Sequence, residues 1–182
     1  YEAQPPTYSL LYARELPADG GPQTCFACMS RALRALPQPL LQRLQGLQLV
    51  HDSTHSSDGM LRSGFGPVVD VAANQQGAVH PAVRELPETG EPVLFPGRRR
   101  NSYAVGLPVS ESEAMLDELW SGISACHNHS WAPGELLIWD NRRLLHRRDA
   151  FPAEARRLMW RMQAQGEAVL PASPATWEQL LR

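Results

Sequence analysis

The sequence predicts a mainly β domain, either a β-sandwich or a jelly roll, with helices packed outside it. Three observations carry this prediction: short strand-like segments recur along the chain, one clear amphipathic helix interrupts them, and 43% of the 182 residues are hydrophobic. Many short strands separated by turns are typical of two-layer β architectures. The chain has no internal repeat, and its length suits one buried core, so we expect a single domain over residues 1–182.

The N-terminal third begins with two strand candidates. Residues 8–16 are rich in Leu, Tyr and Ala and lie between a Pro-Pro pair and a Gly-Gly pair, which predicts a strand that ends in a turn. Residues 24–29 predict a second strand. Residues 31–47 carry apolar side chains at helical spacing, and two prolines divide them into two short helices.

The middle of the chain changes in composition. Residues 52–77 are polar and Gly-rich with little periodicity, which predicts a loop or lid excursion. Ser110-Glu111-Ser112-Glu113 has the pattern of a capping box and predicts a helical insertion over residues 110–126. Short strand candidates at 92–95 and 103–106 lie on either side of a basic run described below.

The last third shows the clearest alternation. Residues 135–140 predict a hydrophobic strand, and residues 156–163 alternate so that Arg157 and Arg161 share one face. Two such side chains on one strand lie about 13 Å apart, and burying them is costly unless they meet anions. From these residues alone, a solvent-exposed basic face is the open alternative.

Charge and hydropathy exclude several classes of partner. The chain has 17 Lys and Arg against 19 Asp and Glu, so no basic field favours nucleic acid or an anionic membrane. No apolar run approaches the roughly 20 residues of a membrane helix, and no signal-peptide pattern opens the chain. We therefore expect a cytoplasmic protein with a small-molecule partner, and its three cysteines do not suggest a disulfide framework or a zinc site.

A longer pattern resembles a known family. Trp139-Asp140-Asn141-Arg142-Arg143-Leu144-Leu145-His146-Arg147, followed by Arg157 and Arg161, is similar to the C-terminal signature of the taurine dioxygenase family, which includes the 2,4-dichlorophenoxyacetate dioxygenases. Segments such as His80-Pro81-Ala82-Val83-Arg84 and Trp131-Ala132-Pro133-Gly134-Glu135 follow in family order. The resemblance covers nearly the whole chain. It implies a cupin-like jelly roll, the double-stranded β-helix, that binds Fe(II) through two histidines and one carboxylate and uses 2-oxoglutarate as co-substrate.

The resemblance also implies roles for single residues. His146 matches the distal histidine ligand of the metal and is the expected catalytic residue. Arg157 matches the arginine that binds the far carboxylate of 2-oxoglutarate, and Thr24 matches the threonine whose hydroxyl supports that carboxylate. Arg161 matches the arginine that binds the acidic group of the prime substrate.

Two aromatic residues are further substrate-binding candidates: Tyr1 resembles the aromatic residue that closes the family's His-x-Asp segment, and Phe95 resembles an aromatic wall of the substrate pocket. Plain core burial is the alternative for each. The basic run Arg98-Arg99-Arg100 has no role that the sequence defines, and a solvated turn is the simpler interpretation.

The chain departs from the family at its start. The His-x-Asp pair that supplies the other two metal ligands matches positions just before Tyr1, so we expect that the N-terminal part of the family domain is missing from this sequence. His51 and His55 are not expected to form a substitute metal site. We expect a structural hydrogen bond for His80, and a surface strand for His127 and His129.

The resemblance implies an enzyme that hydroxylates a small anionic organic substrate, such as a sulfonate or an aryloxyalkanoate, with O2 and with release of succinate and CO2. The family also suggests a homo-oligomer, either a dimer or a tetramer. The alternative, from a different class, is a non-catalytic β-helix protein that binds a ligand or partner and has lost its metal site.

Overall fold

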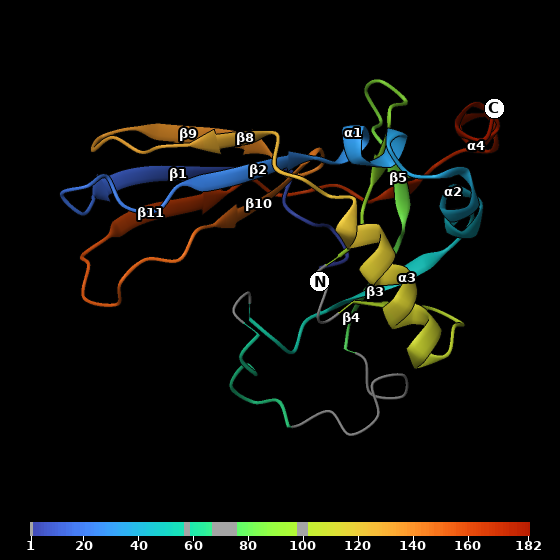
Figure 1. Ribbon diagram of the computed structural model, residues 1–182, viewed down its shortest axis with the longest axis horizontal. Helices are drawn as coiled ribbons and strands as arrows, with labels where there is room; N and C mark the ends of the chain where they lie inside the picture. The colour runs from blue at the N-terminus through green and yellow to red at the C-terminus, as the bar shows by residue number, and fades with distance from the viewer. Residues whose placement is uncertain (1, 57–58, 67–75, 98–101) are drawn as a thin grey trace. The chain divides into compact units, whose positions relative to one another are not determined.

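A computed structural model describes residues 2–56, 59–66, 76–97 and 102–182 of the chain (Figure 1). The chain divides into two compact units. Unit 1 comprises Tyr1–Pro5, Ser30–Ile123 and Ala168–Arg182, and unit 2 comprises Pro6–Met29 and Ser124–Glu167. Strands outnumber helices in the described residues, which confirms the predicted mainly β class.

Unit 2 consists of two three-stranded antiparallel sheets, with strand orders β11-β1-β9 and β10-β2-β8. Figure 1 shows β9, β1 and β11 side by side. The strands of unit 2 are β1 (Tyr8–Glu15), β2 (Thr24–Cys28), β8 (His127–His129), β9 (Leu136–Asp140), β10 (Leu144–Arg148) and β11 (Leu158–Gln163).

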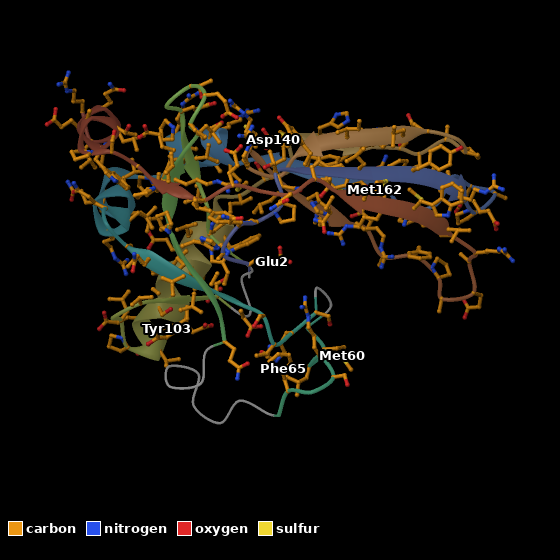
Figure 2. The ribbon with its side chains drawn as sticks, turned by 180° about the vertical axis from the view of Figure 1, so that it is seen from behind. Glu2, Met60, Phe65, Tyr103, Asp140 and Met162 are labelled. Carbon is orange, nitrogen blue, oxygen red and sulfur yellow. The ribbon has the colours of Figure 1, made fainter. Side chains whose placement is uncertain are left out.

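The core of unit 2 is formed by one face of each sheet. On β1, Ser9 and Ala13 are fully buried, and Trp139 of β9 pairs with Ser9 on the same face. The Trp139 ring contacts Phe26 of β2 at a centroid distance of 5.4 Å, so the two inner faces pack together. The opposite face of β11-β1-β9 is apolar and exposed, as alternation requires; Met162, labelled in Figure 2, is its most exposed member.

Unit 1 contains two further three-stranded antiparallel sheets, β12-β5-β6 and β4-β3-β7, together with the helices. Its core is rich in leucine, including Leu33, Leu49 and Leu116, all fully buried. The strands are β3 (Gln48–Asp52), β4 (Gly77–Pro81), β5 (Val83–Glu85), β6 (Pro92–Leu94), β7 (Ser102–Ala104) and β12 (Leu170–Pro171). The helices are α1 (Met29–Arg34), α2 (Gln38–Leu44), α3 (Val109–Ser121) and α4 (Pro174–Leu180).

The two short helices predicted in residues 31–47 correspond to α1 and α2. Between β3 and β4 the described residues hold an isolated bridge between His55 and Leu61 and no named strand or helix. Among the described residues, no helix is both long and apolar enough to cross a membrane.

The capping box predicted for α3 is wrong. The helix begins after Pro108, which occupies the N-cap position and makes no side-chain hydrogen bond there. Ser112 consequently lies inside the helix, where its hydroxyl accepts a hydrogen bond from the backbone N–H of Ala104 in β7 at 2.9 Å. The hydroxyl therefore joins α3 to a strand, and Tyr103 of the same strand is labelled beside the helix in Figure 2.

One carboxylate makes two of the hydrogen bonds that attach the C-terminal helix to its unit. Glu85 of β5 accepts hydrogen bonds from the backbone N–H of Ser173 at 2.9 Å and from the hydroxyl of Thr176 at 2.6 Å. These two donors hold the pKa of Glu85 below its usual range. Ser173 also caps α4 by accepting from the N–H of Thr176 at 3.2 Å.

Candidate functional site

Two rows of side chains cross the β10-β2-β8 sheet of unit 2. The register pairs His146 of β10 with Phe26 of β2, and Phe26 with His127 of β8. It also pairs Arg148 with Thr24, and Thr24 with His129. Because residues two apart on a strand share a face, both rows lie on the same face of the sheet. The predicted residues Thr24 and His146 are therefore neighbours on one surface.

His146 lies against two aromatic rings. Its ring centroid is 4.8 Å from that of Trp139 in a T-shaped arrangement and 6.2 Å from that of Phe26. The residue is nonetheless exposed to solvent on its other side. Burial by these neighbours, and then the positive charge of Arg161, lowers the pKa of His146. A lowered pKa favours the neutral imidazole, which is the form that binds a metal.

Thr24 is almost completely buried, at 2% exposure, and its hydroxyl oxygen accepts a hydrogen bond from the indole Nε1–H of Trp131 at 3.0 Å. Trp131 is itself 6% exposed. A buried hydroxyl that is fixed on one side by a donor still has its own hydrogen to donate.

Arg157 immediately precedes β11 and is half-buried. Its Nε is buried and has no hydrogen-bond partner within the described part of the chain. Burial, and then the charge of Arg148, lowers the pKa of Arg157. Burying a guanidinium nitrogen without a hydrogen-bond acceptor costs free energy, and a bound anion that accepts its hydrogen bond removes this cost.

Arg161 lies on β11 opposite Leu11 of β1. It is exposed, and its charge acts on His146. Within the described ranges, none of the ion pairs involves Arg148, Arg157 or Arg161. The structure thus gathers uncompensated positive charge around Thr24 and His146, which is the electrostatic signature of an anion site.

A complete metal site is not formed by these residues. Among the residues that the structure describes, no three His, Cys, Asp or Glu side chains are grouped to hold a metal ion. His55 pairs with Asp52 at 3.0 Å. The expectation that His51 and His55 form no substitute site stays a prediction. His146 is the one predicted ligand that the chain supplies.

Phe95, predicted as a pocket wall, belongs to unit 1. Its ring contacts His51 at 4.4 Å and His80 at 5.2 Å, and the Arg84 guanidinium lies over it at 4.1 Å. Burial, and then the nearby His80, lowers the pKa of His51 to about 3. Tyr1, the other predicted wall, and Arg98-Arg99-Arg100 lie outside the described residues.

The expected structural role of His80 is confirmed. Its Nε2–H donates to the backbone carbonyl of Glu2 at 2.8 Å, which attaches the start of the chain to the body of unit 1. Glu2 is labelled in Figure 2.

The surface strand expected for His127 and His129 needs correction for one of them. His127 is exposed, but His129 is half-buried and its Nε2 forms a hydrogen bond of 3.1 Å with Glu135. The same carboxylate accepts from the backbone N–H of Ala132 at 3.0 Å, so it joins the turn after Trp131 to His129.

Sequence reasoning missed three residues of the site: Trp131 beside Thr24, Trp139 beside His146, and Arg148 near Arg157. The two tryptophans belong to segments that the family pattern marked, so their position was a usable signal. Arg148 lies two residues after His146 on the same strand face, and this alternation could have identified it.

Comparison with known proteins identifies the family that the sequence resembles, and the match extends over most of the chain. The model of the taurine catabolism dioxygenase TauD, TfdA family matches residues 1–163. An (S)-phenoxypropionate/alpha-ketoglutarate-dioxygenase from Sphingobium herbicidovorans is 34% identical over an alignment length of 180; the alignment covers 88% of this chain and 57% of the relative. An alpha-ketoglutarate-dependent 2,4-dichlorophenoxyacetate dioxygenase from Cupriavidus pinatubonensis is 34% identical over 170 residues, covering 90% of this chain and 56% of the relative.

A solved structure agrees with these relatives. The crystal structure of a taurine dioxygenase from Burkholderia xenovorans aligns with a TM-score of 0.74 and 27% identity, covering 96% of this chain and 58% of that one. This similarity confirms the predicted jelly-roll fold, the double-stranded β-helix. The chain spans a little over half the length of these proteins. It belongs to the TauD/TfdA family of taurine catabolism dioxygenases.

Proposed function

We propose that the whole protein is an Fe(II)- and 2-oxoglutarate-dependent dioxygenase that hydroxylates a small anionic substrate, consuming O2 and releasing succinate and CO2. The observation that carries the proposal is the uncompensated positive charge around Thr24 and His146, above all the buried, partnerless Nε of Arg157. The two relatives described above are named for alpha-ketoglutarate, the same compound as 2-oxoglutarate, and for aryloxyalkanoate substrates.

The residues of unit 2 fit the co-substrate. A dicarboxylic acid needs cationic and hydroxyl donors at its far end, and Arg157 and Thr24 provide both types. A planar guanidinium can donate two parallel hydrogen bonds to one carboxylate, which lysine cannot. These two residues would orient the co-substrate and hold its far carboxylate away from water.

His146 would supply one metal ligand through its neutral imidazole. The other two are expected from a His-x-Asp pair upstream of Tyr1. When bound, iron supplies the activation of O2 and the oxidation of substrate and co-substrate, and the protein contributes placement and exclusion of water.

Arg161 is proposed to bind the acidic group of the prime substrate, a sulfonate, carboxylate or similar anion. Its location on β11 and its electrostatic effect on His146 support this role. Phe95 and Tyr1 remain predicted pocket walls, and the loop or lid predicted over 52–77 and the helical insertion predicted over 110–126 remain part of the proposed single oxygenase domain.

The direct experiment is an anaerobic titration of the full-length protein with Fe(II) and 2-oxoglutarate. We expect a visible charge-transfer band that saturates with 2-oxoglutarate and needs the metal. If 2-oxoglutarate binds equally with and without iron and no band forms, the non-catalytic ligand-binding alternative replaces the enzyme.

The remaining properties of the whole protein are also proposals. We propose a cytoplasmic enzyme that engages neither nucleic acid nor membrane and forms a dimer or tetramer. Light scattering coupled to size-exclusion chromatography measures the oligomeric state, and a monomer at micromolar concentration would contradict it.

A further inference from the structure

The direction of the hydrogen bond between Trp131 and Thr24 is fixed by chemistry. An indole N–H can only donate, so the Thr24 oxygen must be the acceptor in the 3.0 Å contact. The single hydrogen of the threonine hydroxyl therefore points elsewhere. Thr24 makes no other side-chain hydrogen bond in the described part of the chain, so this hydrogen has no acceptor there.

Trp131 is held rigidly enough to impose this direction. One carboxylate oxygen of Glu135 accepts from the backbone N–H of Ala132 at 3.0 Å and bonds the His129 ring at 3.1 Å, so it fixes the residues on both sides of the tryptophan. The His129 ring meets the Trp131 ring edge-on, with centroids 4.7 Å apart and planes at 89°.

The turn that follows Trp131 is attached to β1. The N–H of Gly134 donates to the carbonyl of Ala13 at 2.8 Å, and the N–H of Ala13 donates to the carbonyl of Glu135 at 2.9 Å. Gly134 has a φ of +85°, a conformation that glycine adopts without strain. The position of the indole is thus fixed by its hydrogen bond to Thr24 of β2, by the attachment of the following turn to β1, and by the carboxylate of Glu135.

We propose that Trp131 is a positioning residue for 2-oxoglutarate: it occupies the acceptor side of the Thr24 hydroxyl and directs the hydroxyl hydrogen to the far carboxylate. The order of donation is indole to hydroxyl to carboxylate. This order suits the ligand because a carboxylate only accepts. The inference rests on the proposed function, since it assumes that the far carboxylate lies beside Thr24 and Arg157.

The test compares dissociation constants in the full-length protein loaded with Zn(II), which allows binding without turnover, by isothermal titration calorimetry. Trp131→Phe keeps an aromatic ring and removes the N–H. We expect it to weaken 2-oxoglutarate binding about five- to tenfold, the net effect of one hydrogen bond between neutral groups. Thr24→Val should weaken binding by at least as much, and the double variant should bind no more weakly than Thr24→Val alone.

A second ligand separates positioning from general damage. The keto acid 2-oxobutyrate lacks the far carboxylate, so its affinity should be the same in wild type and in Trp131→Phe. Trp120→Phe is the matched control, because the Trp120 Nε1 is buried and has no hydrogen-bond partner among the residues that the structure describes, so the change removes no hydrogen bond there. Its affinity for 2-oxoglutarate should equal that of the wild type.

A measurement without any variant covers the case in which Trp131→Phe does not fold. In the Zn(II) protein labelled with ¹⁵N at indole nitrogens, saturating 2-oxoglutarate should shift the Trp131 Nε1–H resonance, whereas 2-oxobutyrate should leave it in place. An unmoved resonance in both titrations would overturn the proposal.

The outcomes separate this inference from the proposed function. Wild type that fails to bind 2-oxoglutarate in the presence of metal overturns both. Wild-type binding together with an unchanged Trp131→Phe affinity overturns only the role of Trp131. Equal losses for both keto acids, or losses that multiply in the double variant, would show that Trp131 acts through general packing and not through Thr24.

Discussion

The two units treat their charged groups differently. In unit 1, charges join elements: Glu85 holds α4 through Ser173 and Thr176, and Arg34 pairs with Glu91 at 3.2 Å. In unit 2, the positive charge of Arg148 acts on Arg157, and no carboxylate among the described residues forms an ion pair with either of them. Unit 2 also uses charge for its own structure, as in the Arg142–Asp140 pair at 3.0 Å. What distinguishes it is a group of arginines around Thr24 and His146 that has no ion-pair partner among the described residues, which indicates charge available to a ligand.

The largest expected effect is the acid sensitivity that His51 gives to unit 1. Its folded pKa is about 3, below the 6.5 of an exposed histidine, so between these values the unfolded state binds the proton and the folded state does not. The stabilisation is complete above pH 6.5 and is lost as the pH falls towards 3, on the order of 5 kcal/mol in total.

Urea denaturation between pH 7 and pH 4 measures this loss. In His51→Gln, the free energy of unfolding should depend less on pH than it does in the wild type. His127→Gln, which alters an exposed histidine, is the control and should follow the wild-type curve. Parallel curves for wild type and His51→Gln would contradict the assignment.

The next effect concerns the anchoring of α4. Glu85→Ala removes the acceptor of two hydrogen bonds, so we expect the free energy of unfolding to fall by about 1.5 to 3 kcal/mol. The hydrogen-exchange rates of the α4 amides should increase in the same variant. Arg34→Ala, which breaks an ion pair whose arginine is exposed, should cost less than about 1 kcal/mol. Equal losses for both variants would remove the special role given to Glu85.

The smallest effect on stability is expected at the proposed ligand site. Arg157→Gln removes a guanidinium that has no ion-pair partner in the described residues and that lies near Arg148. We expect the free energy of unfolding without ligand to stay within about 0.5 kcal/mol of wild type or to rise. A loss above about 2 kcal/mol would mean that Arg157 stabilises the fold itself, and the contrast between the units would fail.

Local patterns predicted much of this fold. Alternation over residues 156–163 predicted β11, and the prolines between 31 and 47 predicted the break between α1 and α2. These features depend on neighbouring residues, which is why one sequence suffices for them. The capping-box prediction was wrong at α3 because the helix begins earlier, directly after Pro108, and because the Ser112 hydroxyl hydrogen-bonds the backbone of β7.

The site was predictable only in part. Resemblance to the family indicated His146, Thr24, Arg157 and Arg161, and all four lie in unit 2. The hydrogen bond from Trp131 to Thr24 joins residues 107 positions apart, and the pairing of Arg148 with Thr24 depends on the register of β2 and β10. Such pairings arise from tertiary structure, which no local pattern specifies.

The most direct test of the convergence of His146, Arg157 and Arg161 on one pocket is a pair of anaerobic titrations of the full-length Fe(II) protein. Arg157→Ala should weaken 2-oxoglutarate binding on the order of 100-fold, because it removes a bidentate, charge-assisted contact. Arg161→Ala should leave the 2-oxoglutarate affinity within about threefold of wild type and weaken the anionic prime substrate about tenfold. Equal effects of the two changes on both ligands would contradict the account.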